Sequence, residues 1–161
     1  MADTPQFLQE RLLSEAEKTL IFFRELPEEG WQKTIYTEGS RWTVRQVLAH
    51  FAATEESINR LIENILAGGE GAPEDFNIDV YNERKVASLN EEGRAELMQR
   101  FKSSRQKNAD LVAKMSLDDL TKTGRHPYFG NASLTDIIKL LYRHNQIHLR
   151  DIRRELSQRR A

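Results

Sequence analysis

Hydrophobic residues recur three and four positions apart along four long stretches of the chain, a spacing that places them on one face of an α-helix. In the first stretch the pattern is carried by Leu8, Leu12, Ala16 and Leu20. No stretch alternates convincingly between hydrophobic and polar positions, so the predicted fold class is all-α. The four predicted helices run from Thr4 to Leu26, from Trp42–Thr43 to Gly68–Gly69, from Ser88 to Met115, and from Ser133 towards Arg160.

Residues near the expected helix ends support these boundaries. Thr43 with Gln46, and Ser88 with Glu91, have the spacing of a capping box, in which the two side chains satisfy backbone N–H groups of the first turn. Pro27 follows the first helix, and a proline there ends it because the ring cannot continue the backbone hydrogen bonding.

The connections between these helices are long for a compact domain. Residues 27–41 and 68–87 form the first two, and the third contains the string from Arg125 to Asn131. Since connections of this length often carry function, we predict a four-helix bundle with long loops that act as lids at its ends. No internal repeat or linker divides the chain, and we interpret residues 1–161 as a single domain.

Composition excludes several classes of protein. Hydrophobic residues make up 39% of the 161 residues, enough for one core. The chain has 24 basic and 25 acidic residues, and this balance argues against a nucleic-acid-binding surface, although arginines gather near its end. No apolar run is long enough to cross a membrane. The chain has no cysteine, which excludes disulfides, thiolate metal sites and cysteine nucleophiles. With no signal-peptide pattern, this predicts a cytoplasmic protein.

Two histidines lie on the hydrophobic face of the last predicted helix. At about 100° per residue, His144 and His148 fall within about 20° of the centre of that face. Residues four apart on a helix have Cβ atoms about 5–6 Å apart, which lets both side chains bind one metal ion. His50 in the second helix is the candidate third ligand, and three imidazoles would leave a coordination position open. The alternative is that these are hydrogen-bonded core residues.

Other polar residues have less specific interpretations. Asp151 extends along the face of His144 and His148, where its carboxylate could orient an imidazole or pair with an arginine. His126 precedes a proline in the third connection, and we expect it to have a structural role there.

These residues resemble the DinB-like superfamily, also called DinB/YfiT, over nearly the whole chain. The strongest similarities are the string from Trp42 to His50 and the pair His144 and His148; the string that begins at His126 is also similar. The segment Asp79–Asn82 is similar to one in the mycothiol-dependent maleylpyruvate isomerase branch. The resemblance implies a metal-binding four-helix bundle in which His50, His144 and His148 hold one divalent ion of zinc, nickel or iron.

The resemblance also implies a range of functions. Characterised relatives include transferases that use the small-molecule thiols bacillithiol or mycothiol, and many relatives are homodimers. We therefore predict a homodimer that acts on a small-molecule substrate as a metal-dependent thiol transferase. Because the chain has no cysteine, the thiol would come from a bound cofactor. The candidate polar residues of the pocket are Asp79, Tyr81, Asn82 and Arg84.

Two alternatives remain open at this point. One is a metal-dependent hydrolase, for which Asp151 or Glu55 would have to serve as general base. The other is a non-catalytic, stress-associated dimer that binds a metal or another ligand.

Overall fold

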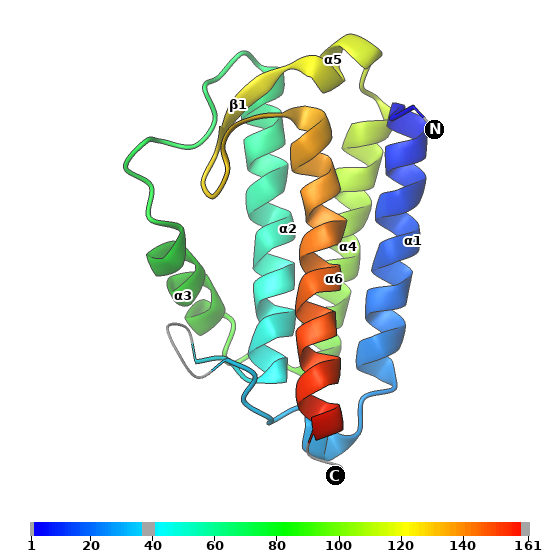
Figure 1. Ribbon diagram of the computed structural model, residues 1–161, viewed down its shortest axis with the longest axis vertical. Helices are drawn as coiled ribbons and strands as arrows, with labels where there is room; N and C mark the ends of the chain where they lie inside the picture. The colour runs from blue at the N-terminus through cyan, green and yellow to red at the C-terminus, as the bar shows by residue number, and fades with distance from the viewer. Residues whose placement is uncertain (1, 37–40, 159–161) are drawn as a thin grey trace.

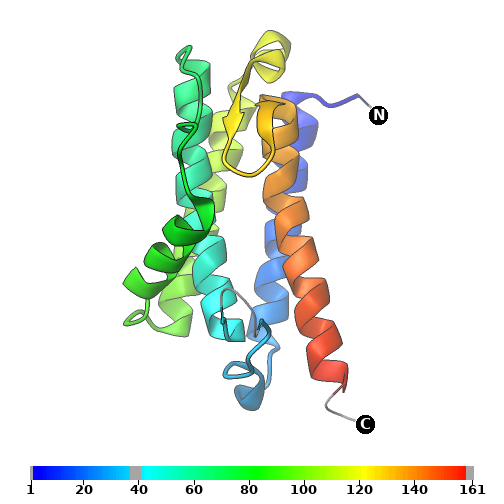
Figure 2. The ribbon, with the colours of Figure 1, turned by 60° about the vertical axis from the view of Figure 1, so that its left-hand side comes forward.

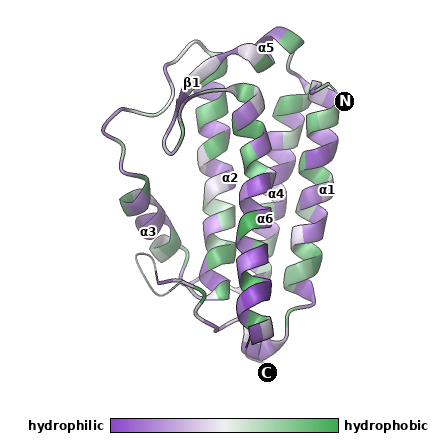
Figure 3. Ribbon diagram, in the orientation of Figure 1, coloured by the Kyte–Doolittle hydropathy of each residue, from purple (hydrophilic) through white to green (hydrophobic). Residues whose placement is uncertain are grey.

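Four long helices lie side by side in the computed structural model, which describes residues 2–36 and 41–158 (Figure 1). The helices are α1 (Pro5–Arg24), α2 (Val44–Leu66), α4 (Arg94–Ala113) and α6 (Leu134–Gln158). Each of them carries both hydrophobic and hydrophilic residues along its whole length (Figure 3). The predicted all-α four-helix bundle is confirmed.

Three of the four long helices begin at residues that the sequence marks as starts. The Thr4 Oγ1 atom accepts a hydrogen bond from Phe7 N at 3.0 Å. Thr43 and Gln46 form the predicted capping box. At the start of α6, Asp136 N donates to the side chain of Ser133 at 3.2 Å. These contacts satisfy N–H groups that have no partner within their own helix.

The arrangement of the helices explains the long connections. In Figure 1, α1 and α6 run downward from N to C, whereas α2 and α4 run upward. Both α1 and α2 pack against α4 and α6, so α1 lies diagonally opposite α2, and α4 lies diagonally opposite α6. The chain must therefore cross the end of the bundle after α1 and again after α4. Between the parallel helices α2 and α4 it must return along the length of the bundle.

The predicted start of the third helix is wrong. Ser88 does not cap a helix; it ends the separate helix α3 (Ile78–Ser88), and α4 begins six residues later at Arg94. The α3 helix lies outside the bundle against α2, inside the segment that the sequence suggested was a loop (Figure 2). Only Val86 of α3 is buried. A helix with so little buried surface leaves almost no hydrophobic period in the sequence.

The third connection also contains structure that the periodicity does not reveal. It forms a short helix α5 (Leu117–Thr121) and then an antiparallel hairpin of β1 (Thr123–His126) and β2 (Gly130–Ser133). Each strand has four residues, too few to show a clear alternation. A short 3₁₀ helix (Glu28–Gly30) follows α1.

The bundle interior has two hydrophobic clusters, each formed by residues of all four long helices. One lies towards the end of α1 and includes Phe23, Phe51, Phe101 and Leu149. The other lies towards the start of α6 and includes Leu12, Ile62, Val112 and Ile137. Within the described residues, no helix combines the length and apolar character needed to cross a membrane.

Candidate metal centre

Three histidine side chains converge between α2 and α6. His50 Nε2 lies 2.9 Å from His144 Nε2, and His148 Nε2 lies 3.0 Å from that same atom. The candidate ligand atoms of the three residues all lie within 4.8 Å of one another. In the described part of the chain, no other three His, Cys, Asp or Glu residues have this spacing. The three histidines that the sequence singled out are thus close enough to ligate one ion.

Aromatic residues surround the three imidazoles. The Trp42 ring lies 4.7 Å from the His50 ring, between centroids. The Phe51 ring lies 5.8 Å from the ring of His144 and 5.6 Å from that of His148. Both Trp42 and Phe51 are buried. These rings limit the movement of the imidazoles and keep water away from one side of the cluster.

A tyrosine that the sequence analysis did not select supports the cluster. The Tyr36 hydroxyl lies 2.7 Å from His148 Nδ1 and donates a hydrogen bond to Asp151 Oδ2 at 2.8 Å. Asp151 also forms an ion pair with Arg154 at 2.8 Å. Asp151 therefore reaches the imidazole through Tyr36, and its other oxygen pairs with an arginine. A contact between residues 112 positions apart leaves no signal in the sequence.

Tyr36 also determines which nitrogen of His148 faces the cluster. Because the hydroxyl proton goes to Asp151, the Tyr36 oxygen accepts a hydrogen bond from the Nδ1–H of His148. In the neutral imidazole, Nε2 then carries the lone pair. Metal-ligating histidines are commonly held in this way, with the second ring nitrogen donating to a protein group.

The hydrogen-bonding capacity of the cluster fits a cation. His144 Nε2 can act either as donor or as acceptor, so only one of its two short contacts, to His50 or to His148, can be a normal hydrogen bond. If instead all three Nε2 atoms present lone pairs, a cation between them satisfies all three. His144 Nδ1 is buried and has no hydrogen-bond partner among the described residues, so it lacks the support that Tyr36 gives to His148.

Burial keeps the three imidazoles neutral. It lowers the pKa of His50 from 6.5 to about 3, with a further contribution from His148. Burial likewise lowers the pKa of His148 to about 4, against the opposing effect of the Asp151 carboxylate. The pKa of His144 is also lowered well below its usual value, mainly by burial. Neutral imidazoles are the form that binds metal ions.

A cavity of about 1060 Å³ lies beside the three histidines and is bounded by α2, α3, the hairpin and α6. Half of the residues that line it are hydrophobic, among them Leu61, Phe76 and Leu140. The predicted pocket residues Asp79, Tyr81 and Asn82 also line it, whereas Arg84 does not. Their role in ligand binding remains a prediction.

Glu55 cannot act as the general base of a hydrolase. Its side chain is 1% exposed and pairs with the equally buried Arg105 at 2.7 Å. Asn108 Nδ2 donates to its other oxygen at 2.9 Å. Glu55 does not line the cavity. This network lies inside the bundle and links α2 to α4.

His126 has the contacts expected of a structural residue. Its Nδ1 accepts hydrogen bonds from the backbone N–H groups of Tyr128 at 3.0 Å and Phe129 at 3.4 Å, which hold the turn of the hairpin. His126 is buried, and this burial lowers its pKa.

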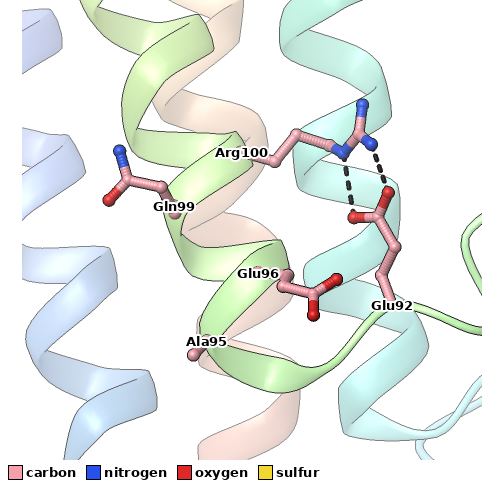
Figure 4. A pocket seen from close by; sticks show the side chains of 5 residues that line it. All are labelled: Glu92, Ala95, Glu96, Gln99 and Arg100. Atoms are coloured by element: carbon pink, nitrogen blue, oxygen red, sulfur yellow. Dashed lines mark hydrogen bonds and ion pairs between the residues drawn. The ribbon is translucent and has the colours of Figure 1, made fainter.

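A second, smaller hollow of about 440 Å³ lies at the start of α4 (Figure 4). Its main charged groups are already paired: Arg100 donates to Glu92 and to Glu56. Among the described residues, those that line the hollow include no histidine and no unpaired buried group, and we assign no site to it.

Comparison with known proteins supports this interpretation of the fold. The sequence profile of the DinB superfamily matches residues 11–152. Among solved structures, YfiT from Bacillus subtilis is similar, with a TM-score of 0.68 and 16% identity over 94% of this chain and 86% of YfiT. YfiT is described as a probable metal-dependent hydrolase with an unusual four-helix bundle topology. No curated protein matches the chain in sequence. Because the family profile spans most of its length, the chain belongs to the DinB superfamily.

Proposed function

We propose that this protein binds one divalent metal ion through His50, His144 and His148. We further propose that the ion promotes a reaction of small molecules bound in the adjacent cavity. The observation that carries the proposal is the convergence of three neutral imidazole nitrogens within 4.8 Å at the wall of the cavity. Zinc, nickel and iron(II) all accept imidazole ligands. An ion held by three imidazoles keeps an open position and lowers the pKa of a thiol or water bound there.

The surroundings of the histidines favour a thiol as the nucleophile. Asp151 is separated from His148 by the Tyr36 hydroxyl, to which its carboxylate is hydrogen-bonded. Held in this way, Asp151 is poorly placed to act as a general base on a water molecule. A free thiol has a pKa of about 8.5, whereas that of water is about 15.7, so a thiol needs far less help to lose its proton. We propose that the protein is a metal-dependent thiol transferase that uses a small-molecule thiol of the bacillithiol or mycothiol type.

The size of the cavity is consistent with two reactants. Sites for a single small ligand have volumes of about 300–1,000 Å³, and this cavity, with about 1060 Å³, is slightly larger than that range. With 1-chloro-2,4-dinitrobenzene as a model electrophile, the sulfur–carbon bond forms, the carbon–chlorine bond breaks, and chloride leaves while the thiol proton passes to solvent.

A first experiment tests the metal. Elemental analysis of protein purified without chelator and supplemented with zinc, nickel or iron should give about one ion per chain. His148→Ala should lose the ion, whereas Arg143→Ala, on the exposed side of α6, should keep it. Equal and negligible metal content in the wild type and His148→Ala would contradict the proposal.

A second experiment tests the reaction. The metal-loaded protein is mixed with 1-chloro-2,4-dinitrobenzene and either bacillithiol, mycothiol or no thiol. We expect conjugation only with a thiol, and its loss in His148→Ala. Hydrolysis is the second candidate, because the structurally similar YfiT is described as a probable metal-dependent hydrolase. Turnover of 4-nitrophenyl acetate without thiol would favour it. Metal binding without either activity would favour the non-catalytic alternative.

A further inference from the structure

The lining of the cavity includes two cations that have no carboxylate partner among the described residues. Arg60 of α2 and Lys85 of α3 are the cationic residues among those that line the cavity. Neither forms an ion pair with any residue that the structure describes. The nearby acid Glu56 is instead paired with Arg100. The cavity wall also includes one carboxylate, that of Asp79, so the cations outnumber the acids there.

Hydrogen bonds hold Arg60 in place. Ser57 Oγ donates to Ala53 O at 3.0 Å, so it accepts from the Tyr81 hydroxyl, which lies 2.7 Å away. The Tyr81 oxygen is then free to accept from Arg60 Nη2 at 3.0 Å. This directed chain uses one N–H of the guanidinium and leaves the others without an acceptor among the described residues. The Lys85 ammonium lies over the Tyr81 ring, 5.6 Å from its centroid.

Tyr81 therefore brings both cations to one place in the cavity. A guanidinium with free N–H donors and an ammonium group beside it are the groups that bind carboxylate or phosphate oxygens in proteins. Hydrophobic side chains also line the cavity, among them Leu61 and Phe76. The arrangement suits a ligand with an anionic group at one end and an apolar body.

We propose that Arg60, Tyr81 and Lys85 form an anion-binding subsite for a carboxylate or phosphate group of the small molecule that occupies the cavity. This proposal depends on the proposed function in one respect: the proposed function determines which end of that molecule reacts at the metal. Ser57 and Arg60 follow His50 by seven and ten residues on the same helix, which corresponds to roughly 10–15 Å at 1.5 Å per residue. The subsite therefore selects ligands whose anionic group lies about that distance from the reacting atom.

Binding of three matched probes tests the proposal. The probes are 6-phenylhexanoate, its neutral amide 6-phenylhexanamide, and 5-phenylpentyl phosphate, titrated calorimetrically into the zinc-supplemented full-length protein. We expect at least one anion to bind about tenfold more tightly than the amide. A double variant, Arg60→Gln with Lys85→Gln, should remove this preference. Arg84→Gln, on α3 but outside the cavity lining, is the matched control and should retain it.

The comparison of carboxylate with phosphate decides which anion the subsite prefers. Equal binding of amide and anions by the wild type would overturn the proposal. So would an anion preference that survives in the double variant, because the anion would then be bound elsewhere, for example by the metal. His148→Ala separates the two proposals: we expect this variant to lose metal and turnover but to keep the anion preference.

Discussion

The Tyr36 hydroxyl lies 2.7 Å from His148 Nδ1 while it donates its proton to Asp151 at 2.8 Å. This pair of contacts joins the connection after α1 to the middle of α6, and it makes Nε2 the free nitrogen of His148. Burial and the neighbouring Asp151 carboxylate raise the pKa of Tyr36, so the tyrosine keeps its proton. The orientation of a candidate ligand therefore depends on a residue outside the bundle.

Replacement of Tyr36 by phenylalanine should weaken metal binding without unfolding the protein. Loss of the group that holds a ligating imidazole typically costs about 10–100-fold in metal affinity. We expect a decrease of that size in Tyr36→Phe, measured by competition with a chromogenic zinc chelator. Tyr128→Phe is the control, since Tyr128 is 74% exposed. An unchanged affinity in Tyr36→Phe would show that the contact does not support the metal site.

The metal-free protein should lose stability as the pH falls from 8 to 5. The pKa values of His50 and His148 are lowered from 6.5 to about 3 and about 4 in the folded state. Below the unfolded-state pKa of about 6.5, the unfolded chain binds more protons than the folded one, so acid favours unfolding. The stabilisation is fully present above pH 6.5 and decreases as the pH falls towards the folded-state values.

Urea denaturation of the chelator-treated protein at pH 8, 6.5 and 5 measures this effect. We expect the midpoint to fall towards pH 5 in the wild type, and to fall less in His50→Gln, which has one fewer buried imidazole. A pH dependence that is identical in the two proteins would contradict the role assigned to His50. Zinc should raise the midpoint at neutral pH, because the ion binds the folded state.

The main helices and the histidine cluster could be predicted because their signals are local. His144 and His148 are one turn apart on one helix, so their proximity follows from helix geometry alone. The start of α2 is recognisable from Thr43 and Gln46 for the same reason. The contact of His50 with His144 joins two helices. The position of His50 on its helix made it a candidate, and the resemblance to a family strengthened that prediction.

The features that could not be predicted depend on tertiary packing. Tyr36 contacts a residue 112 positions away, and its role follows from the path of the connection after α1. The α3 helix buries little surface, so it has no clear hydrophobic period. Glu55 is buried as the partner of Arg105. The hydrophobic periodicity does not mark Arg105 as a buried residue. Each of these becomes evident only when the four helices are packed together.

The buried pair of Arg105 and Glu55 should contribute strongly to stability when one partner is removed. Both side chains are 1% exposed, and Arg105 also donates to Leu12 O at 2.9 Å. Arg105→Leu leaves the Glu55 carboxylate buried without its counter-charge, which costs about 3–5 kcal/mol. We expect a loss of that size in the free energy of unfolding, measured with urea. The exposed-pair control Arg100→Leu should lose about 1 kcal/mol or less. Similar losses in the two variants would argue against the buried ion pair.

Gly71 should tolerate alanine less well than Gly68 does, although both have a positive φ, of 90° and 92°. A Cβ atom at Gly71 would lie 2.4 Å from the backbone N of Arg125, whereas one at Gly68 would meet nothing within 4 Å. Both substitutions strain the backbone by about 1–3 kcal/mol, but only Gly71→Ala also pushes the hairpin away from the cavity wall. We expect Gly71→Ala to lower the free energy of unfolding more than Gly68→Ala, and to weaken binding of the phenylhexanoate probe. Equal losses in both variants would mean that Gly71 serves only to allow the positive φ.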